Sequence, residues 1–98
     1  MLIISGDITA RADSIAEMTR AALEHVRRSR LEPGCVSHDV SIDAENALRL
    51  IFFERWQDVA ALRTHFALPA SRTFWRLLQE LAAKTGAMQI YDAREINL

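Results

Sequence analysis

The chain has 98 residues, half of them apolar, and its 12 basic and 13 acidic residues give a formal net charge of −1. This length suits one domain, and the apolar share excludes an intrinsically disordered chain. Basic and acidic residues are interleaved, so the sequence lacks the basic patch of a nucleic-acid-binding surface. We therefore expect a single folded domain, residues 1–98, without a nucleic-acid partner.

Cysteine content and hydropathy bear on the location of the protein. Cys35 is the only cysteine, which excludes an intramolecular disulfide, a cysteine-ligated zinc site and an iron–sulfur cluster. The N-terminus has only a short apolar run without a preceding positive charge, and no run approaches the roughly 18 apolar residues of a membrane helix. We expect a cytoplasmic protein without a signal peptide or membrane span.

The N-terminal part of the chain predicts a strand and then a helix. Residues 2–9 are rich in isoleucine, as in a short strand. Asp13 is a good N-cap, and the helix ends in Arg27-Arg28-Ser29-Arg30, whose three arginines suit the helix dipole. Pro33 and Gly34 then stop the helix and turn the chain. Between the two ends, apolar residues recur at helical spacing: Ile15, Met18, Ala22 and Val26.

A hairpin follows. Residues 35–42 alternate in polarity, residues 43–46 form a polar turn, and residues 47–56 return as an antiparallel strand, because so short a link cannot hold a crossover. The alternation predicts two faces for the first strand of the hairpin. One face carries Val36, His38, Val40 and Ile42, and the other carries Cys35, Ser37, Asp39 and Ser41.

The C-terminal part predicts an interrupted helix and a last strand. Asp58 is placed to cap a helix that Pro69 interrupts, and Ser71 is placed to cap its continuation. Gly86 is expected to end this helix, and residues 88–96 read as a strand.

The predicted order is β-α-β-β-α-β. This is the order of the ferredoxin-like α+β fold, in which one four-stranded antiparallel sheet carries its helices on one face. The other face is left uncovered, and burial of apolar surface is worth about 25 cal/mol per Å². We therefore expect a second copy of the chain to cover this face in a homodimer.

Three motifs connect the sequence to a known family. Glu32-Pro33-Gly34-Cys35 is followed by Glu54-x-Trp56-x-Asp58, and then by Ala61-Leu62-x-x-His65 with Pro69 four residues later. Together they resemble the antibiotic biosynthesis monooxygenase (ABM) family, over residues 2–91. The resemblance implies one ABM-like domain that pairs sheet to sheet in a dimeric α+β barrel. That family includes quinol and polyketide monooxygenases, haem-degrading enzymes and autoinducer-processing proteins.

His65 stands at the position of the family's recurrent histidine, on a helix face shared with Leu62 and Phe66. A neutral imidazole there, with a reference pKa of about 6.5, suits a general base or an orienting group. A packing histidine bonded to a backbone carbonyl is the structural alternative. His38 shares a strand face with Val40, so we expect it beneath the helices, where it either joins His65 or is simply buried.

Asp7 is expected on the strand face of Ile3 and Ser5, and the resemblance implies a cleft-lining acid or amide at this position. A carboxylate near His65 would hold the tautomer of the imidazole and stabilise its protonated form. In a different strand register, Asp7 would only be a solvated strand end. His25 stands among charged residues, and we expect it on the solvated side of its helix.

Aromatic side chains and one acid are the candidates for substrate binding. Trp56, Phe74 and Trp75 could enclose a planar ring, since aromatic rings stack with centroids about 4.5–7 Å apart, and core filling is the alternative. Glu54 shares a strand face with Phe52. A buried carboxylate needs a partner, so an arginine or a backbone amide is expected beside Glu54 if it lies inside.

Motifs for a bound cofactor are missing. The sequence has no phosphate-binding glycine loop, nucleophile elbow or dinucleotide fingerprint, and no His-x-x-x-His or Glu-x-x-His spacing that would indicate a metal site. The haem-degrading branch of the family carries an Asn, Trp and His set. Aligned with it, this sequence has Asp7, His65 and Trp75, so haem degradation is not expected. We expect neither a metal nor a cofactor.

The sequence and its resemblance favour a cofactor-independent monooxygenase that oxidises a small electron-rich aromatic, a quinol or a polyketide-like compound, with O₂. In this interpretation His65 takes the phenol proton, and Asp7 or His38 orients it. Two alternatives stay open. One is a dimeric ligand-binding or stress-response protein that uses the same cleft without chemistry, and the other is an isomerase of the autoinducer type.

Overall fold

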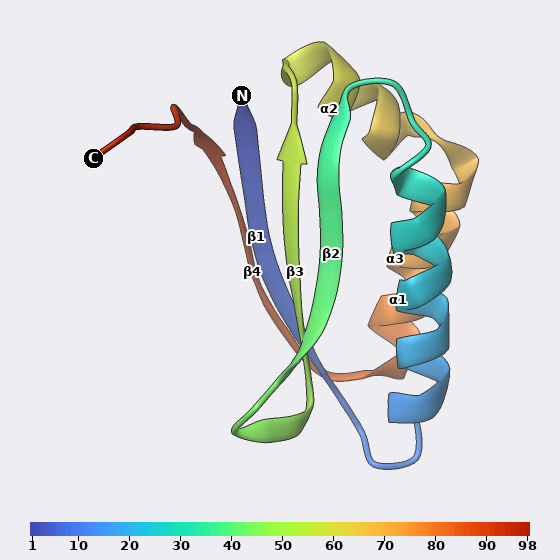
Figure 1. Cartoon of the computed structure of the whole chain (residues 1–98). Coiled ribbons are helices and arrows are strands. Elements are labelled where there is room, and N and C mark those ends of the chain that lie inside the picture. Colours follow the sequence, from blue (N-terminus) through green and yellow to red (C-terminus); the bar gives the residue numbers. More distant parts are fainter.

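The computed structural model describes residues 1–98, and seven elements follow one another along the chain (Figure 1). They are β1 (Leu2–Ala10), α1 (Ile15–Ser29), β2 (Cys35–Asp43), β3 (Asn46–Trp56), α2 (Val59–Ala67), α3 (Pro69–Leu81) and β4 (Ala82–Asp92).

The four strands form one antiparallel sheet in the order β2-β3-β1-β4. All three helices cover the same face of this sheet, and the opposite face carries no element of the chain (Figure 1). The predicted ferredoxin-like α+β fold is therefore confirmed. No helix is long and apolar enough to cross a membrane.

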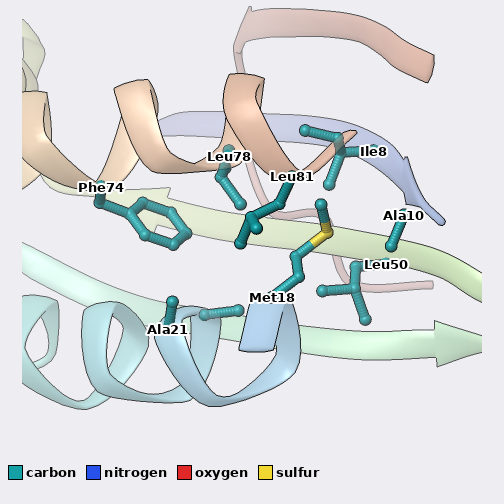
Figure 2. Close-up of a cluster of buried hydrophobic side chains, with 9 residues drawn as sticks. Ile8, Ala10, Met18, Ala21, Leu50, Phe74, Leu78 and Leu81 are labelled. Atoms are coloured by element: carbon teal, nitrogen blue, oxygen red, sulfur yellow. The ribbon is translucent and has the colours of Figure 1, made fainter. Parts of the chain in front are cut away.

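Buried apolar side chains form two clusters between the sheet and the helices. The larger cluster joins the lower half of the sheet to α1 and α3 (Figure 2). It contains Ile8, Ala10, Met18, Ala21, Ala22, Leu50, Phe74, Leu78 and Leu81. The smaller cluster lies near α2 and contains Leu2, Ile4, Trp56 and Leu62. This division leaves room for polar side chains between the two clusters.

The helix ends differ from the sequence prediction. The N-cap of α1 is Ser14 rather than Asp13, and the Ser14 hydroxyl accepts from Arg11 N at 3.0 Å and donates to Leu81 O at 2.6 Å. The hydroxyl thus connects the start of α1 to the end of α3. Asp13 instead pairs with the Arg11 side chain at the surface.

The helix α3 also begins and ends earlier than predicted. Pro69 occupies its first turn, where the missing proline N–H costs no hydrogen bond, so Ser71 lies inside the helix and is buried rather than acting as a cap. The helix ends at Leu81, because Ala82 already pairs with Ala10 in the sheet, and Gly86 lies within β4. The last strand consequently ends at Asp92 rather than at residue 96.

A bulge at the start of β2 changes the predicted faces of two residues. Cys35 lies opposite Trp56, whereas Ser37 lies opposite Arg55, so Val36 is the extra residue. Cys35 therefore packs against the smaller apolar cluster and Val36 is half exposed, the reverse of the prediction. The alternation holds beyond the bulge, and His38 is buried beneath the helices as predicted.

Candidate functional site

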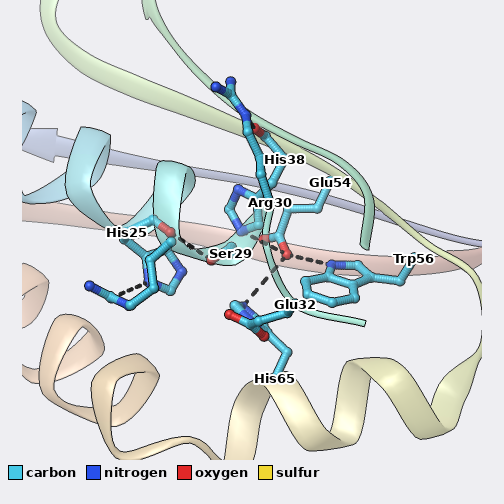
Figure 3. A network of polar contacts seen from close by, with 9 residues as sticks. His25, Ser29, Arg30, Glu32, His38, Glu54, Trp56 and His65 are labelled. Carbon is cyan, nitrogen blue, oxygen red and sulfur yellow. Dashed lines mark hydrogen bonds and ion pairs between the residues drawn. The ribbon is translucent and has the colours of Figure 1, made fainter. Parts of the chain in front are cut away.

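Three buried histidines from three different elements meet between the sheet and the helices (Figure 3). His25 comes from α1, His38 from β2 and His65 from α2. The ring centroid of His25 lies 5.2 Å from those of His38 and His65, which are 5.6 Å from each other. We call these three residues the histidine cluster. They are all the histidines of the chain.

The position of His25 corrects the expectation of a solvated side chain, since only 5% of His25 is exposed. His25 continues the inward stripe of α1, three residues after Ala22 and four before the buried Ser29. Its ring stacks on Phe74 of α3 at 4.1 Å with an interplanar angle of 11°. The helical spacing of this stripe was the available signal, and the charged neighbours along the sequence obscured it.

A carboxylate orients His65. Nδ1 of His65 lies 2.8 Å from Oε1 of Glu32, in the connection between α1 and β2. A carboxylate can only accept, so Nδ1 carries the proton and the lone pair of the neutral ring is on Nε2. The sequence motif that contains Glu32 was recognised, but this role was not.

The turn at Pro33 and Gly34 places Glu32 against α2. Gly34 has φ of 83°, which favours glycine, and a Cβ there would collide with Ala61 of α2. Gln57 N donates to Gly34 O at 2.8 Å, and Asp58 caps α2 as predicted by accepting from Ala61 N at 2.8 Å. The close approach of turn and helix brings Glu32 to His65.

Glu54 of β3 is the second acid of the site. Its Oε1 accepts from Trp56 Nε1 at 2.9 Å and lies 3.1 Å from His38 Nε2 and 4.0 Å from His65 Nε2. Burial raises the pKa of Glu54, but the contact with His38, the indole hydrogen bond and the charge of His65 together hold the pKa below its ordinary value. The partners of Glu54 are thus an indole and two imidazoles, not the expected arginine or backbone amide.

The other two histidines differ in their contacts. Nδ1 of His25 accepts from Arg28 Nη2 at 3.1 Å. Burial, and then repulsion by His38, His65 and Arg28, lowers the pKa of His25 to about 3, so its ring is neutral at pH 7. Neither ring nitrogen of His38 makes a hydrogen bond, and its Nε2 contacts Glu54 Oε1 as an ion-pair partner at 3.1 Å.

The histidine cluster and Glu54 form one end of a cavity of about 460 Å³. This volume lies within the range of about 300–1,000 Å³ for small-molecule sites, and most of the wall is apolar. Five of the predicted site residues line the cavity: His38, His65, Glu54, Phe74 and Trp75. Further wall residues come from the sheet, α2 and α3: Ile4, Gly6, Ile8, Phe52, Phe66, Leu78 and Met88.

Two predicted site residues lie elsewhere than the hypothesis required. Trp56 is fully buried and lies behind His65, with the ring centroids 4.5 Å apart, so it supports the imidazole rather than the cavity wall. Asp7 reaches the cavity wall, but its Oδ2 accepts from Arg49 Nε at 3.0 Å. The carboxylate in contact with His65 is Glu32, not Asp7.

The glycine opposite Asp7 explains where this carboxylate lies. A Cβ at Gly86 of β4 would collide with the Asp7 side chain, so the carboxyl group occupies space that only glycine leaves free. The register between β1 and β4 also shifts between Gly6 and Ile8, next to Asp7. Asp7 therefore joins β4 to Arg49 rather than orienting the histidine cluster.

Comparison with known proteins agrees with this geometry. The family model described as antibiotic biosynthesis monooxygenase matches residues 1–77. An uncharacterized protein of Synechocystis sp. is 31% identical over 96% of this chain, which spans 64% of that protein's length.

Solved structures share the whole architecture. A Deinococcus radiodurans protein, provisionally described as an antibiotic biosynthesis monooxygenase, is 28% identical with a TM-score of 0.93, covering 100% of this chain and 98% of its own. A Mycobacterium tuberculosis protein superposes with a TM-score of 0.89 at 21% identity, over 97% of this chain and 96% of its own, which shows the shared fold. The matched sequence model, which includes the residues of the Glu-Pro-Gly turn and His65, places the chain in the antibiotic biosynthesis monooxygenase family.

Proposed function

We propose that this protein is a cofactor-independent monooxygenase that oxidises a small electron-rich aromatic, a quinol or a polyketide-like phenol, with O₂. The observation that carries the proposal is the pairing of His65 with Glu32 at one end of an apolar cavity. Membership of the family and likeness to proteins described as monooxygenases support the reaction class.

In this reaction His65 is the general base. Glu32 holds Nδ1, so Nε2 is free to take the proton of a phenolic hydroxyl. The resulting imidazolium would lie between two carboxylates, with Glu32 at 2.8 Å and Glu54 at 4.0 Å. Opposite charge at these distances stabilises the protonated ring and so favours the phenolate.

The phenolate supplies the electrons for the rest of the reaction. One electron passes to O₂, and the superoxide and phenoxyl radicals combine at a ring carbon that carries hydrogen. The peroxide anion formed there takes the proton back from the His65 imidazolium, and the resulting hydroperoxide loses water to leave a quinone. One oxygen atom thus enters the substrate and the other leaves as water. Phe74 and Trp75 line the cavity that would hold the ring, and the mostly apolar wall offers few polar groups that could divert the intermediate.

The test is His65→Ala, measured by quinol-dependent oxygen uptake and by melting temperature on the same sample. A positioned base contributes about 10²–10⁴-fold, so we expect kcat to fall by that factor while the protein stays folded. Arg63→Ala, at an exposed position of the same helix, is the matched control and should turn over normally.

Two results would contradict the proposal. A His65→Ala protein that melts several degrees lower yet keeps the wild-type rate would reduce His65 to a packing residue. Conversion of a substrate without any oxygen uptake would favour the isomerase alternative, for which His65 and Glu54 are the acid–base groups.

A further inference from the structure

We infer that the histidine cluster and Glu54 together form a binding site for one divalent transition-metal ion, of which Zn²⁺ is the probe. The inference goes beyond the proposed reaction, which uses no metal. An ion bound at Nε2 of His65 would take the nitrogen that acts as the base, so the proposed reaction belongs to the metal-free chain. It starts from geometry: one nitrogen from each of His25, His38 and His65 can be chosen so that all three lie within 4.8 Å of one another. Imidazole is the ligand that zinc, copper, nickel and iron share.

To bind one ion, the three ligand nitrogens must move closer together than the 4.8 Å within which they lie. Ligand nitrogens around a tetrahedral ion with Zn–N bonds of about 2.0–2.1 Å are roughly 3.4 Å apart. The three rings come from α1, β2 and α2, and small side-chain rotations would bring their nitrogens closer. The three histidines line the cavity, which gives an ion a path of entry.

An independent observation is the lack of partners at His38. Only 1% of this residue is exposed, and neither ring nitrogen has a hydrogen-bond partner. A buried polar group without a hydrogen bond has lost its contacts with water and gained none in return, so native proteins rarely retain one without a reason. A neutral imidazole keeps one lone pair, and because His38 lines the cavity beside two other imidazoles, this lone pair is available to a metal ion.

The buried carboxylate of Glu54 also favours a bound cation. Glu54 is buried, and no lysine or arginine pairs with it. Its partners are Trp56, His38 and His65. A buried carboxylate without a full positive charge beside it is unfavourable. A divalent ion held by the three imidazoles would supply that charge, and Glu54 would be its fourth ligand.

The surrounding contacts resemble those that support metal ligands in proteins. Metal-binding histidines usually donate their second N–H to a carboxylate or carbonyl, which fixes the ring. Glu32 does this for His65, and the Trp56 indole holds Glu54. Arg28 donates to Nδ1 of His25, so a metal ion can bind at Nδ1 only after this hydrogen bond breaks. The Arg28 side chain is exposed and can move into solvent.

The experiment uses the untagged full chain, because the histidine cluster contains its only histidines. The protein is freed of metal with a chelator, and Zn²⁺ affinity is measured by competition with a chromophoric chelator. We expect one Zn²⁺ per chain. Co²⁺ then replaces Zn²⁺, and its visible spectrum should be that of a four- or five-coordinate ion with nitrogen ligands.

Variants assign the ligands. Supporting carboxylates contribute about 10–100-fold to affinity, so Glu32→Gln should weaken Zn²⁺ binding by that factor, and His38→Leu should weaken it by more than about 100-fold. Cys35→Ser and Glu45→Gln remove the lone thiol and an exposed carboxylate and should leave the affinity unchanged. If His38→Leu does not fold, the affinity of Glu32→Gln for Zn²⁺ and the Co²⁺ spectrum of the wild type test whether the metal site exists.

Each outcome tests the metal site independently of the proposed monooxygenase reaction. Zn²⁺ affinity that is unchanged by His38→Leu, or lost in Cys35→Ser, would overturn the inference, as would the absence of binding to the folded wild-type chain. Oxygen uptake is measured separately on the metal-free chain, so a protein that binds Zn²⁺ but is inactive without metal would refute the proposed reaction alone. An active protein without Zn²⁺ affinity would refute the metal site alone.

Discussion

His25 shows how position can remove the charge of a titratable side chain. Its ring lies between Phe74 and the other two histidines, out of reach of any carboxylate hydrogen bond. Desolvation is the main cause of its lowered pKa, and two imidazoles and a guanidinium add to it. The neutral ring can therefore pack against an aromatic side chain without the cost of a buried charge.

This lowered pKa predicts a pH dependence of stability in the metal-free protein. Between the unfolded pKa of 6.5 and the folded pKa of about 3, the unfolded chain binds a proton that the folded chain does not. Acidification in this window therefore favours unfolding, by at most about 1.4 kcal/mol per pH unit for one proton. Stability due to His25 is fully present above pH 6.5 and is lost as the pH falls toward 3.

Denaturant unfolding of wild type and His25→Phe, from about pH 7 to about pH 4, measures this contribution. We expect the unfolding free energy of the wild type to fall more steeply on acidification than that of the variant. The carboxylates contribute equally to the pH dependence of the unfolding free energy in both proteins, so the difference between the two slopes reports His25 alone. Parallel curves would mean that His25 titrates alike in the folded and unfolded chains.

At the scale of elements, the connection from α1 to β2 decides the geometry of the site. Cys35 N donates to Glu32 O at 3.2 Å, which closes the turn, and Gly34 makes the hydrogen bond with Gln57 at the end of β3. The chain thus presses onto α2 at Ala61, one helical turn before His65. The same turn that starts the strand also orients the imidazole.

Gly34→Ala tests this coupling. A left-handed conformation costs about 1–2 kcal/mol for a residue with a Cβ, and the contact with Ala61 adds to it, so we expect the unfolding free energy to fall by at least that amount. Displacement of Glu32 should also lower kcat. Gly6→Ala is the control for stability alone, since Gly6 lines the cavity; the nearest atoms to a Cβ there are at 3.8 Å and no positive φ is required. Equal effects of the two substitutions on stability would refute the role of the turn.

At the scale of the whole molecule, the uncovered face of the sheet is the main unpartnered surface. Ile3 and Ile51 are partly buried there, and Phe53 and Tyr91 are nearly half exposed. Ile3 lies opposite Tyr91, and Ser5 lies opposite Phe53, so these side chains form one continuous patch over β3, β1 and β4. Apolar patches of this kind on a sheet face are suited to association.

We expect this face to pair with a second copy of the chain. Sedimentation at micromolar concentration should give twice the chain mass of 11.1 kDa, and Phe53→Arg should shift the protein toward the monomer. Leu31→Arg, at an exposed apolar residue outside the sheet, is the matched control. A wild-type protein that stays monomeric at this concentration would rule out the dimer, and a dimer unaffected by Phe53→Arg would place the contact elsewhere.

The sequence by itself determined what depends on local spacing. Period-two alternation identified β2 and the inward position of His38, Asp58 identified the start of α2, and the Glu-Pro-Gly and His65 motifs identified the family. Each of these signals lies within about one element, where hydrogen bonding and residue conformation act between near neighbours.

Only the tertiary structure decided what depends on distant contacts. The end of α3 at Leu81 depends on the Ser14 hydroxyl and on pairing with β1, which no local residue indicates. Glu32 rather than Asp7 reaches His65, because the turn approaches α2 while Arg49 holds Asp7. The histidine cluster has no ligand spacing along the chain, since its members belong to three elements that meet only when the helices pack on the sheet.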